Sequence, residues 1–274
     1  KIKNEDSKYS LREVIWAIQN GYLESGDVQF DWDALIVDGG NTNITIEVKY
    51  GSIDITDNIS ITIDLTKQEQ LVPVGVTLTI NASGNGESAF VVNGSSLSLG
   101  GEKNNNLTLI GATTAGNGGA IDIEAGTVNL ENVDISRGHA ELGGAIYLAS
   151  GSAFLTASGT TFSNNTASSG GAIYNNGGQV TFSGGGNSFS NNQAGNGGAI
   201  YNNRGTLSLG GVSFSGNSAT VNGGAIYNNG SSLSVADGGV FTGNHATENG
   251  GAIYNDGNGS LTIQGGEFSG NYTD

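Results

Sequence analysis

The sequence contains no cysteine, no methionine and one proline, and it has nine lysine and arginine residues against 25 aspartate and glutamate residues. Without cysteine, neither a disulfide framework nor a thiolate zinc site can form. The formal net charge of −16 repels phosphate backbones and anionic lipids, so we expect no binding of nucleic acid. Because no apolar run approaches the ~20 residues that span a bilayer, we also expect no direct insertion into a membrane.

Glycine is abundant, at 48 residues, and hydrophobic residues make up 36% of the chain. A glycine-rich chain can be a disordered linker, but here apolar residues recur at every second place in many short stretches, as at Ile44, Ile46 and Val48. Glycine does not occupy every third place, which excludes a collagen helix. The alternation is typical of strands with one buried face, so we expect an all-β core.

Two motifs repeat in phase. Gly-Gly-Ala-Ile occurs six times, and successive copies begin 25, 27, 27, 26 and 27 residues apart, at Gly118, Gly143, Gly170, Gly197, Gly223 and Gly250. Phe-x-x-Asn follows in step at Phe162/Asn165, Phe189/Asn192, Phe214/Asn217, Phe241/Asn244 and Phe268/Asn271. Self-similarity at this period indicates a solenoid in which each repeat is one coil, stacked about 4.8 Å above the previous coil.

The first repeat indicates which residues face the core. Its tyrosine position is Asp122 and its next position is Ile123, and an unpaired carboxylate is costly in an apolar core. Since neighbouring strand residues face opposite sides, we expect the isoleucine of each copy inside and its alanine and tyrosine outside. The inward isoleucines are Ile121, Ile146, Ile173, Ile200, Ile226 and Ile253. The outer column consists of Tyr147, Tyr174, Tyr201, Tyr227 and Tyr254.

Equivalent side chains of successive coils should lie on top of one another. The phenylalanines of the second motif are expected to stack in the core, together with the pairs Val128/Leu130, Ala153/Leu155, Val180/Phe182, Leu207/Leu209, Leu233/Val235 and Leu261/Ile263. The asparagines of the second motif are expected at a bend, where their amides can bond to the backbone and to each other as a ladder. We interpret both columns as structural, because a buried amide needs partners.

We expect one β-helix domain over residues 1–274. A capping box of Ser10 and Glu13, followed by apolar residues at helical spacing, predicts a helix over about residues 10–20, between Tyr9 and Gly21, that caps the N-terminal end. The cap takes up residues 1–27, irregular coils residues 28–117 and regular coils residues 118–274. The chain ends where a further Gly-Gly-Ala is due, so we expect the solenoid to be truncated there.

The alternation of Gly-Gly-Ala-Ile with Phe-x-x-Asn, from Gly118 to Asn271, resembles the repeats of the chlamydial polymorphic outer-membrane proteins and similar autotransporter-like adhesins. The segment Tyr-Ser-Leu-Arg-Glu-Val-Ile, from Tyr9 to Ile15, is similar to the Cys-Ser-Leu-Arg-Glu-Ala-Ile motif near the start of related surface β-helix proteins, with tyrosine for cysteine and valine for alanine. The resemblance implies a right-handed, single-stranded parallel β-helix passenger that is exported to the cell surface and attaches to host or neighbouring cells.

The tyrosine column is the candidate binding surface. A flat row of aromatic rings beside asparagine and glycine can stack against sugar rings or receive a protein partner. Alternatively, the stacked tyrosines only stabilise neighbouring coils, as cross-strand aromatic pairs do. The two interpretations are compatible.

An enzyme is the rival class, because parallel β-helices also host polysaccharide lyases and hydrolases, which need paired carboxylates or a metal-bound acid cluster with a base. The candidates are Asp134, Arg137, His139 and Glu141 at one turn and His245 and Glu248 at another. No acid occurs from Leu142 to Ala236, so we expect no catalytic site and no cofactor. The early acids Asp31, Asp33, Asp38, Asp54, Asp57 and Asp64 suit calcium, but without an EF-hand loop no metal site is predicted.

We therefore expect a secreted or cell-surface adhesin passenger, whose partner is a protein or glycan of a host or neighbouring cell. The alternative is a structural fibre, sheath or surface-layer subunit that associates end to end. A polysaccharide lyase or hydrolase is the third hypothesis.

Overall fold

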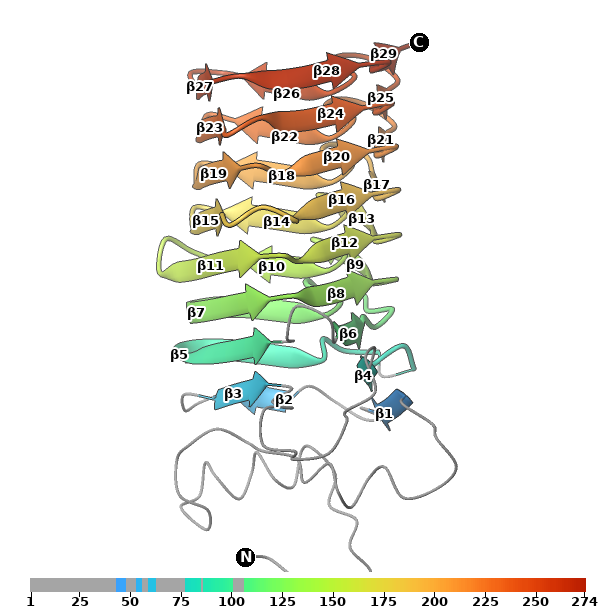
Figure 1. Ribbon diagram of the computed structural model, residues 1–274, viewed down its shortest axis with the longest axis vertical. Helices are drawn as coiled ribbons and strands as arrows, with labels where there is room; N and C mark the ends of the chain where they lie inside the picture. Colours follow the sequence, from blue (N-terminus) through green and yellow to red (C-terminus); the bar gives the residue numbers. More distant parts are fainter. Residues whose placement is uncertain (1–42, 48–52, 56–58, 63–76, 85, 101–105) are drawn as a thin grey trace, which may run out of the picture.

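The computed structural model describes residues 43–47, 53–55, 59–62, 77–84, 86–100 and 106–274. In these ranges the chain forms strands and no helix, and the strands wind into a parallel β-solenoid of about seven turns (Figure 1). The expected helix between Tyr9 and Gly21 lies outside the described residues.

Each regular coil passes through four strand positions, which we call the first to fourth columns in chain order. The first column, which begins at the repeated isoleucine, contains β10 (Ile146–Leu148), β14 (Ile173–Asn176), β18 (Ile200–Asn203), β22 (Ile226–Asn229) and β26 (Ile253–Asp256). The second contains β11 (Ala153–Ser158), β15 (Gln179–Phe182), β19 (Thr206–Gly210), β23 (Ser232–Ala236) and β27 (Ser260–Ile263). Two long strands, β5 (Phe90–Gly100) and β7 (Ile121–Glu131), run through both columns, and β5 pairs with β2 (Ile53–Ile55) and β3 (Ile59–Thr62).

The third column is a sheet of nine strands and the fourth a sheet of six. The third contains β1 (Asn43–Glu47), β4 (Thr77–Asn81), β6 (Asn106–Ile110), β8 (Val133–Ser136), β12 (Thr161–Ser163), β16 (Ser188–Ser190), β20 (Ser213–Ser215), β24 (Gly239–Thr242) and β28 (Gly266–Ser269). The fourth contains β9 (His139–Leu142), β13 (Thr166–Ser169), β17 (Gln193–Ala194), β21 (Ser218–Ala219), β25 (His245–Ala246) and β29 (Tyr272–Thr273).

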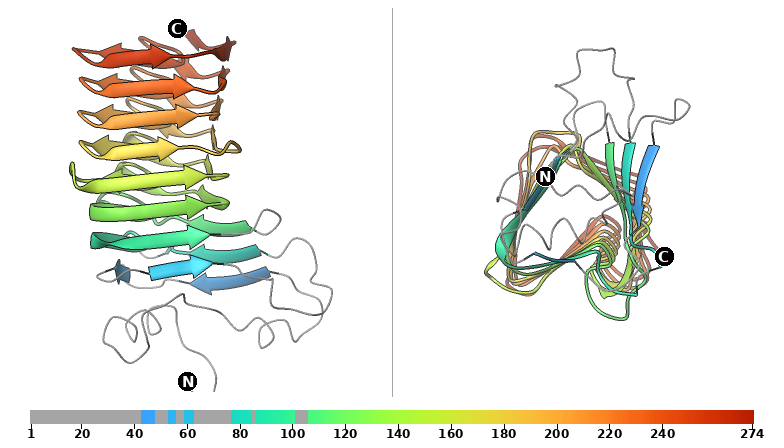
Figure 2. Two further views of the ribbon diagram at one scale, coloured as in Figure 1. Left: turned by 60° about the vertical axis from the view of Figure 1, so that its left-hand side comes forward. Right: turned by 90° about the horizontal axis from the view of Figure 1, so that it is seen from below.

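The strands pair in parallel and in register, so equivalent residues of successive coils are direct neighbours. Ile173 pairs with Ile200 in the first column, and Phe189 pairs with Phe214 in the third. Viewed along the long axis, the regular coils superimpose (Figure 2). Any side chain that recurs once per coil therefore forms a continuous column along the molecule.

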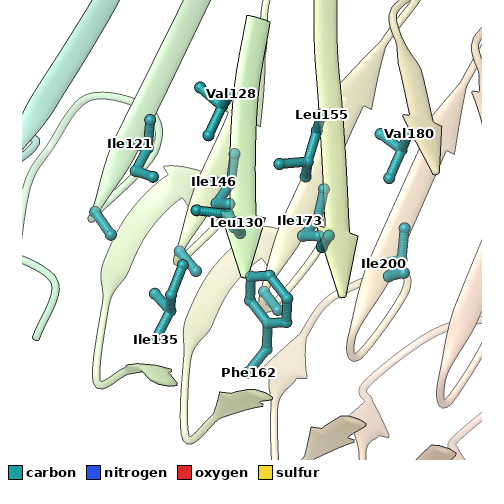
Figure 3. Packing of buried hydrophobic residues seen from close by; sticks show 14 of the residues in the cluster. Ile121, Val128, Leu130, Ile135, Ile146, Leu155, Phe162, Ile173, Val180 and Ile200 are labelled. Carbon is teal, nitrogen blue, oxygen red and sulfur yellow. The ribbon is translucent and has the colours of Figure 1, made fainter. Parts of the chain in front are cut away.

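The interior is filled by these columns of apolar side chains. Ile146 and Ile173 of the first column and Leu155 and Val180 of the second belong to one buried cluster (Figure 3). In the third column, Phe162, Phe189, Phe214 and Phe241 are fully buried and stack with ring centroids 4.7–4.8 Å apart and planes within 6° of parallel. Burial of each such side chain stabilises the fold by about 1.5–3 kcal/mol, so every coil adds a similar contribution to the stability of the core.

The alanine of Gly-Gly-Ala-Ile is buried, which corrects the expectation that it faces outward. Five of its six copies have no exposed surface, namely Ala120, Ala145, Ala172, Ala199 and Ala225. The backbone N–H groups of Ala145 and Ile146 both donate to the carbonyl of Ala172, at 2.9 Å each. In an extended strand, successive N–H groups point to opposite sides. The chain thus bends at the alanine, the strand begins at the isoleucine, and both side chains enter the core.

The last described coil is uncovered on one side. Leu261, Ile263, Phe268 and Tyr272 are 36–56% exposed there, although Leu261, Ile263 and Phe268 continue columns that are buried in the coils below.

Candidate functional site

The five tyrosines of the first column form a pile on the outer side of their strands. Neighbouring ring centroids are 4.7–5.8 Å apart, and the planes of Tyr201 lie at 11° to Tyr174 and 21° to Tyr227. The rings of Tyr147, Tyr174, Tyr201 and Tyr254 are partly buried, and Tyr227 is only 9% exposed. Within the pile the three inner rings have a neighbouring ring on each side, so an approaching molecule meets mainly ring edges. This arrangement fits the stabilising interpretation better than a platform on which sugar rings stack.

The tyrosine hydroxyls bond to a polar column that runs beside the pile. The amide of Asn229 donates to the hydroxyl of Tyr201 at 3.4 Å, and the hydroxyl of Tyr227 donates to Asp256 at 2.7 Å. The same polar column is linked along its length, because Asn203 donates to Asn176 at 3.0 Å and Asn229 donates to Asn203 at 3.1 Å. The outer face of the first column is therefore a connected network rather than a row of free side chains.

Burial makes Tyr174, Tyr201 and Tyr227 hard to ionise. It raises the pKa of Tyr174, to which Tyr201 and Tyr147 add, and it also raises the pKa of Tyr201. The pKa of Tyr227 is strongly raised, first by burial and then by its hydrogen bond to Asp256.

Asp122 occupies the tyrosine position of the first regular coil and pairs directly with Tyr147. Its Oδ1 atom is buried and has no hydrogen-bond partner. Burial raises the pKa of this carboxyl to about 6, and the charge of Glu124 adds to the effect. The carboxyl group of Asp122, next to the first tyrosine of the pile, is therefore poorly solvated.

The asparagines of Phe-x-x-Asn form a buried ladder at the bend between the third and fourth columns. Asn165, Asn192, Asn217 and Asn244 have no exposed surface. Side-chain amides donate from Asn165 to Asn192, from Asn192 to Asn217 and from Asn244 to Asn271, at 2.8–3.0 Å. The Asn192 amide also donates to the carbonyl of Phe162 at 3.0 Å. The side-chain amides of these asparagines therefore bond to one another and to the backbone, and they are not available to a ligand.

A second amide ladder, which the motif analysis did not single out, lies in the interior of the first column. Asn175, Asn202 and Asn228 are fully buried, and each donates its amide to the next asparagine, at 2.6–2.8 Å. The signal was present in the sequence, because Asn175 takes the inward position that Ile123 and Leu148 hold in earlier coils. Since Leu148 cannot donate a hydrogen bond, the Oδ1 atom of Asn175 is left without a partner.

Four segments of the chain, residues 159–176, 188–203, 211–229 and 238–256, match the family model of the Chlamydia polymorphic membrane protein (Chlamydia_PMP) repeat. The chain carries chlamydial polymorphic membrane protein-like repeats. Each matched polymorphic membrane protein-like repeat runs through the third, fourth and first columns and contains the Phe-x-x-Asn and Gly-Gly-Ala-Ile-Tyr motifs. The strands of the second column lie outside all four matches. No curated protein and no solved structure matches the chain.

Three of the candidate catalytic residues, Asp134, Glu141 and His245, each bond to a residue outside the candidate set. Asp134 accepts a hydrogen bond from Thr161, Glu141 accepts one from Ser168 at 3.2 Å, and Arg137 adopts a left-handed turn with φ 61°. In the described part of the chain, no hydrogen bond or ion pair joins any two of Asp134, Arg137, His139 and Glu141. His245 pairs with Asp274 at 2.9 Å and stacks on Tyr272. Glu248 donates its backbone N–H to the carbonyl of Val221, and within the described ranges no hydrogen bond or ion pair joins its side chain to His245.

The described residues contain no group of three or more His, Cys, Asp or Glu side chains that could hold a metal ion. Of the early acids considered for calcium, Asp54 lies in β2, of which only the backbone is described, and the others lie outside the described residues. None of the described residues belongs to a helix long and apolar enough to cross a membrane.

Proposed function

We propose that the chain is the passenger of an autotransporter-like adhesin, a rigid rod at the cell surface that attaches to a protein or glycan of a host or neighbouring cell. The single observation that carries the proposal is the set of four polymorphic membrane protein-like repeats, which fall on successive coils of one parallel solenoid. The proposal includes right-handed winding, which is the hand of nearly all parallel crossover connections.

A rod of stacked coils suits attachment because its surface is repetitive and its core is uniform. The regular coils from Leu142 to Ala236 carry no acid, and the buried amides of the two ladders bond to one another, apart from the Oδ1 atom of Asn175. We therefore propose a binding role without catalysis. Degradation of a polysaccharide by the purified chain, abolished by Asp134→Asn or His139→Ala, would overturn this part of the proposal.

The adhesin role is tested by attachment of beads coated with the purified chain to cultured animal cells and to bacterial cells. We expect specific, saturable attachment to at least one cell type. Heat-unfolded chain on the same beads is the control for non-specific adhesion. Attachment that equals this control on every cell type contradicts the proposal.

A structural surface fibre is the second candidate, because a rod of stacked, in-register coils suits a mechanical role as well as attachment. Light scattering against concentration separates the two functions. Ordered rods that grow with concentration favour the fibre, and a monomer at all concentrations excludes it.

A further inference from the structure

Phe154 is an exposed aromatic side chain in the body of the solenoid. Its surface is 36% exposed, and the other large hydrophobic side chains of comparable exposure in the described ranges belong to the uncovered last coil. Phe154 instead has coils on both sides, because β11 pairs with β7 below and β15 above. Its exposure is thus a property of the outer face and not of an open end.

The residues stacked on Phe154 are polar. Thr127 lies below it and Gln179 above it, and the same position in the following coils is Thr206, Ser232 and Ser260. In the described part of the chain no aromatic ring stacks on Phe154, whereas each inner tyrosine of the first column is covered on both faces. The ring of Phe154 is therefore not covered by another aromatic ring, and the side chain is 36% exposed.

A groove of about 460 Å³ lies on the second column, and its lining includes Leu99, Leu130 and Ala157 as well as polar residues. Its polar lining consists of Ser98, Asn129, Glu131, Thr156, Ser158 and Ser183. Thr156 follows Phe154 by two residues, so it faces the same side about 7 Å further along β11. The ring of Phe154 thus lies next to a residue of the groove lining on the same face of β11.

The hydrogen-bonding groups of the groove are held in place by one another. The hydroxyl of Thr156 donates to Oδ1 of Asn129 at 2.7 Å, and the amide of Asn129 donates to the hydroxyl of Ser98 at 3.3 Å. Each hydroxyl can still form a further bond, and the Asn129 amide keeps a second N–H. On the other side of Phe154, the loop of residues 149–152 projects beyond the stack of coils (Figure 1). Ser150 anchors this loop by donating to the carbonyl of Glu124 at 3.0 Å.

We propose that this surface binds a neutral oligosaccharide, with one sugar ring against Phe154 and the next in the groove. The apolar face of a pyranose matches an exposed aromatic ring, and its hydroxyls match the amide and hydroxyls of the groove. The carboxylate of Glu131 and the net charge of −16 disfavour sulfated or sialylated chains. One aromatic ring among polar residues is too small an apolar area for the core of a protein interface.

This inference rests on the proposed adhesin function and names its ligand class. It places recognition on the second column, outside the four polymorphic membrane protein-like matches, so the matched columns build the rod and the second column carries the specificity.

The test applies the full chain to an array of chitotetraose, cellotetraose, maltotetraose and N-acetyllactosamine repeats, with sialyllactose and heparin as anionic probes. We expect binding to at least one neutral probe, about tenfold weaker for Phe154→Ala and unchanged for Phe154→Trp. Asn129→Ala should also weaken binding. Thr206→Ala, a change at the equivalent position two coils higher, is the matched control and should bind like the wild type. Thermal unfolding of every variant checks that the fold is intact.

Binding to no neutral probe, a preference for heparin, or equal losses in Phe154→Ala and Thr206→Ala would each overturn the inference. Cell attachment distinguishes its failure from that of the proposed function. If Phe154→Ala attaches to cells as well as the wild type, also after glycosidase treatment of the cells, the adhesin function stands and the inference falls. If Phe154-dependent binding occurs on the array but the chain attaches to no cell, the inference stands and the adhesin function falls.

Discussion

The side-chain oxygen of Asn217 accepts two hydrogen bonds from Asn192 in the preceding coil, one from the amide at 2.9 Å and one from the backbone N–H at 3.0 Å. Asn217 in turn donates its amide to Asn244 at 2.9 Å and to the carbonyl of Phe189 at 3.0 Å. All these groups are inaccessible to water, so each asparagine is a polar link between coils that the apolar columns cannot replace.

Removal of this link should destabilise the protein strongly. We expect Asn217→Ala to lower the free energy of unfolding by about 3 kcal/mol, because it leaves buried donors of Asn192 without an acceptor, at ~1–3 kcal/mol per group. Asn217→Asp should be at least as harmful at neutral pH, since it points a carboxylate at the carbonyl of Phe189. Urea unfolding followed by circular dichroism measures both changes. Gln193→Ala, an exposed neighbour, is the control and should stay within about 0.5 kcal/mol of the wild type. A similar loss in Gln193→Ala and Asn217→Ala contradicts the ladder's role.

The second glycine of each motif is required by the approach of the next coil. A Cβ atom on Gly198 would overlap the backbone carbonyl oxygens of Gly224 and Ser218, which are fixed by the pairing of coils. We expect Gly198→Ala to destabilise by about 3 kcal/mol, at the upper end of overpacking effects. Gly84→Ala is the matched control, because a Cβ there meets no atom within 4 Å. Thermal unfolding of the two variants should differ by several degrees, and equal melting temperatures would show that the backbone can relax.

The stacked columns could be predicted from the sequence because a fixed period places equivalent residues one coil apart. Ile173 and Ile200 illustrate this, since they are one repeat apart and pair directly in the structure. The inward position of Ala172 could not be predicted, because alternation holds only inside a strand and the bend before Ile173 leaves no mark in the residue pattern. The interior ladder of Asn175 was open to prediction, since its position is apolar in earlier coils.

The surface was harder to predict than the core. Alternation indicates that Tyr174 and Tyr201 face outward, but it does not determine the ring orientation, on which their binding properties depend. Their rings lie 4.8 Å apart and cover each other. The groove beside Phe154 was missed for a different reason, since it combines residues of β5, β7 and β11 that no local motif connects.

Alkaline pH should loosen the solenoid through the tyrosine pile. Burial raises the pKa of Tyr174, Tyr201 and Tyr227 in the folded chain, whereas unfolded tyrosines titrate near their usual pKa of about 10. Above that pH the unfolded state binds fewer protons than the folded state, so the free energy of unfolding falls as pH rises. Ultraviolet absorbance of phenolate should therefore show late-titrating tyrosines, and Tyr201→Phe should reduce the alkaline loss of stability. Ionisation of all tyrosines near pH 10 with an unchanged circular dichroism spectrum would contradict this account.

Asp122 should make the protein more stable at mildly acidic pH than at neutral pH. Its pKa is raised from 3.8 to about 6 in the folded chain, first by burial and then by Glu124. Between these two values the folded state binds more protons than the unfolded state, so the free energy of unfolding falls as pH rises through this window, and the full cost is present above pH 6. After allowance for partial solvent screening, the cost is about 1–2 kcal/mol.

Asp122→Asn should remove this cost, raising the melting temperature by roughly 2–6 °C at neutral pH and hardly at pH 4. Glu267→Gln, an exposed change in the last coil, serves as the control for a general loss of negative charge. A gain in Asp122→Asn that is equal at both pH values, or matched by Glu267→Gln, would mean that the unpartnered Oδ1 atom of Asp122 is not the source of the strain.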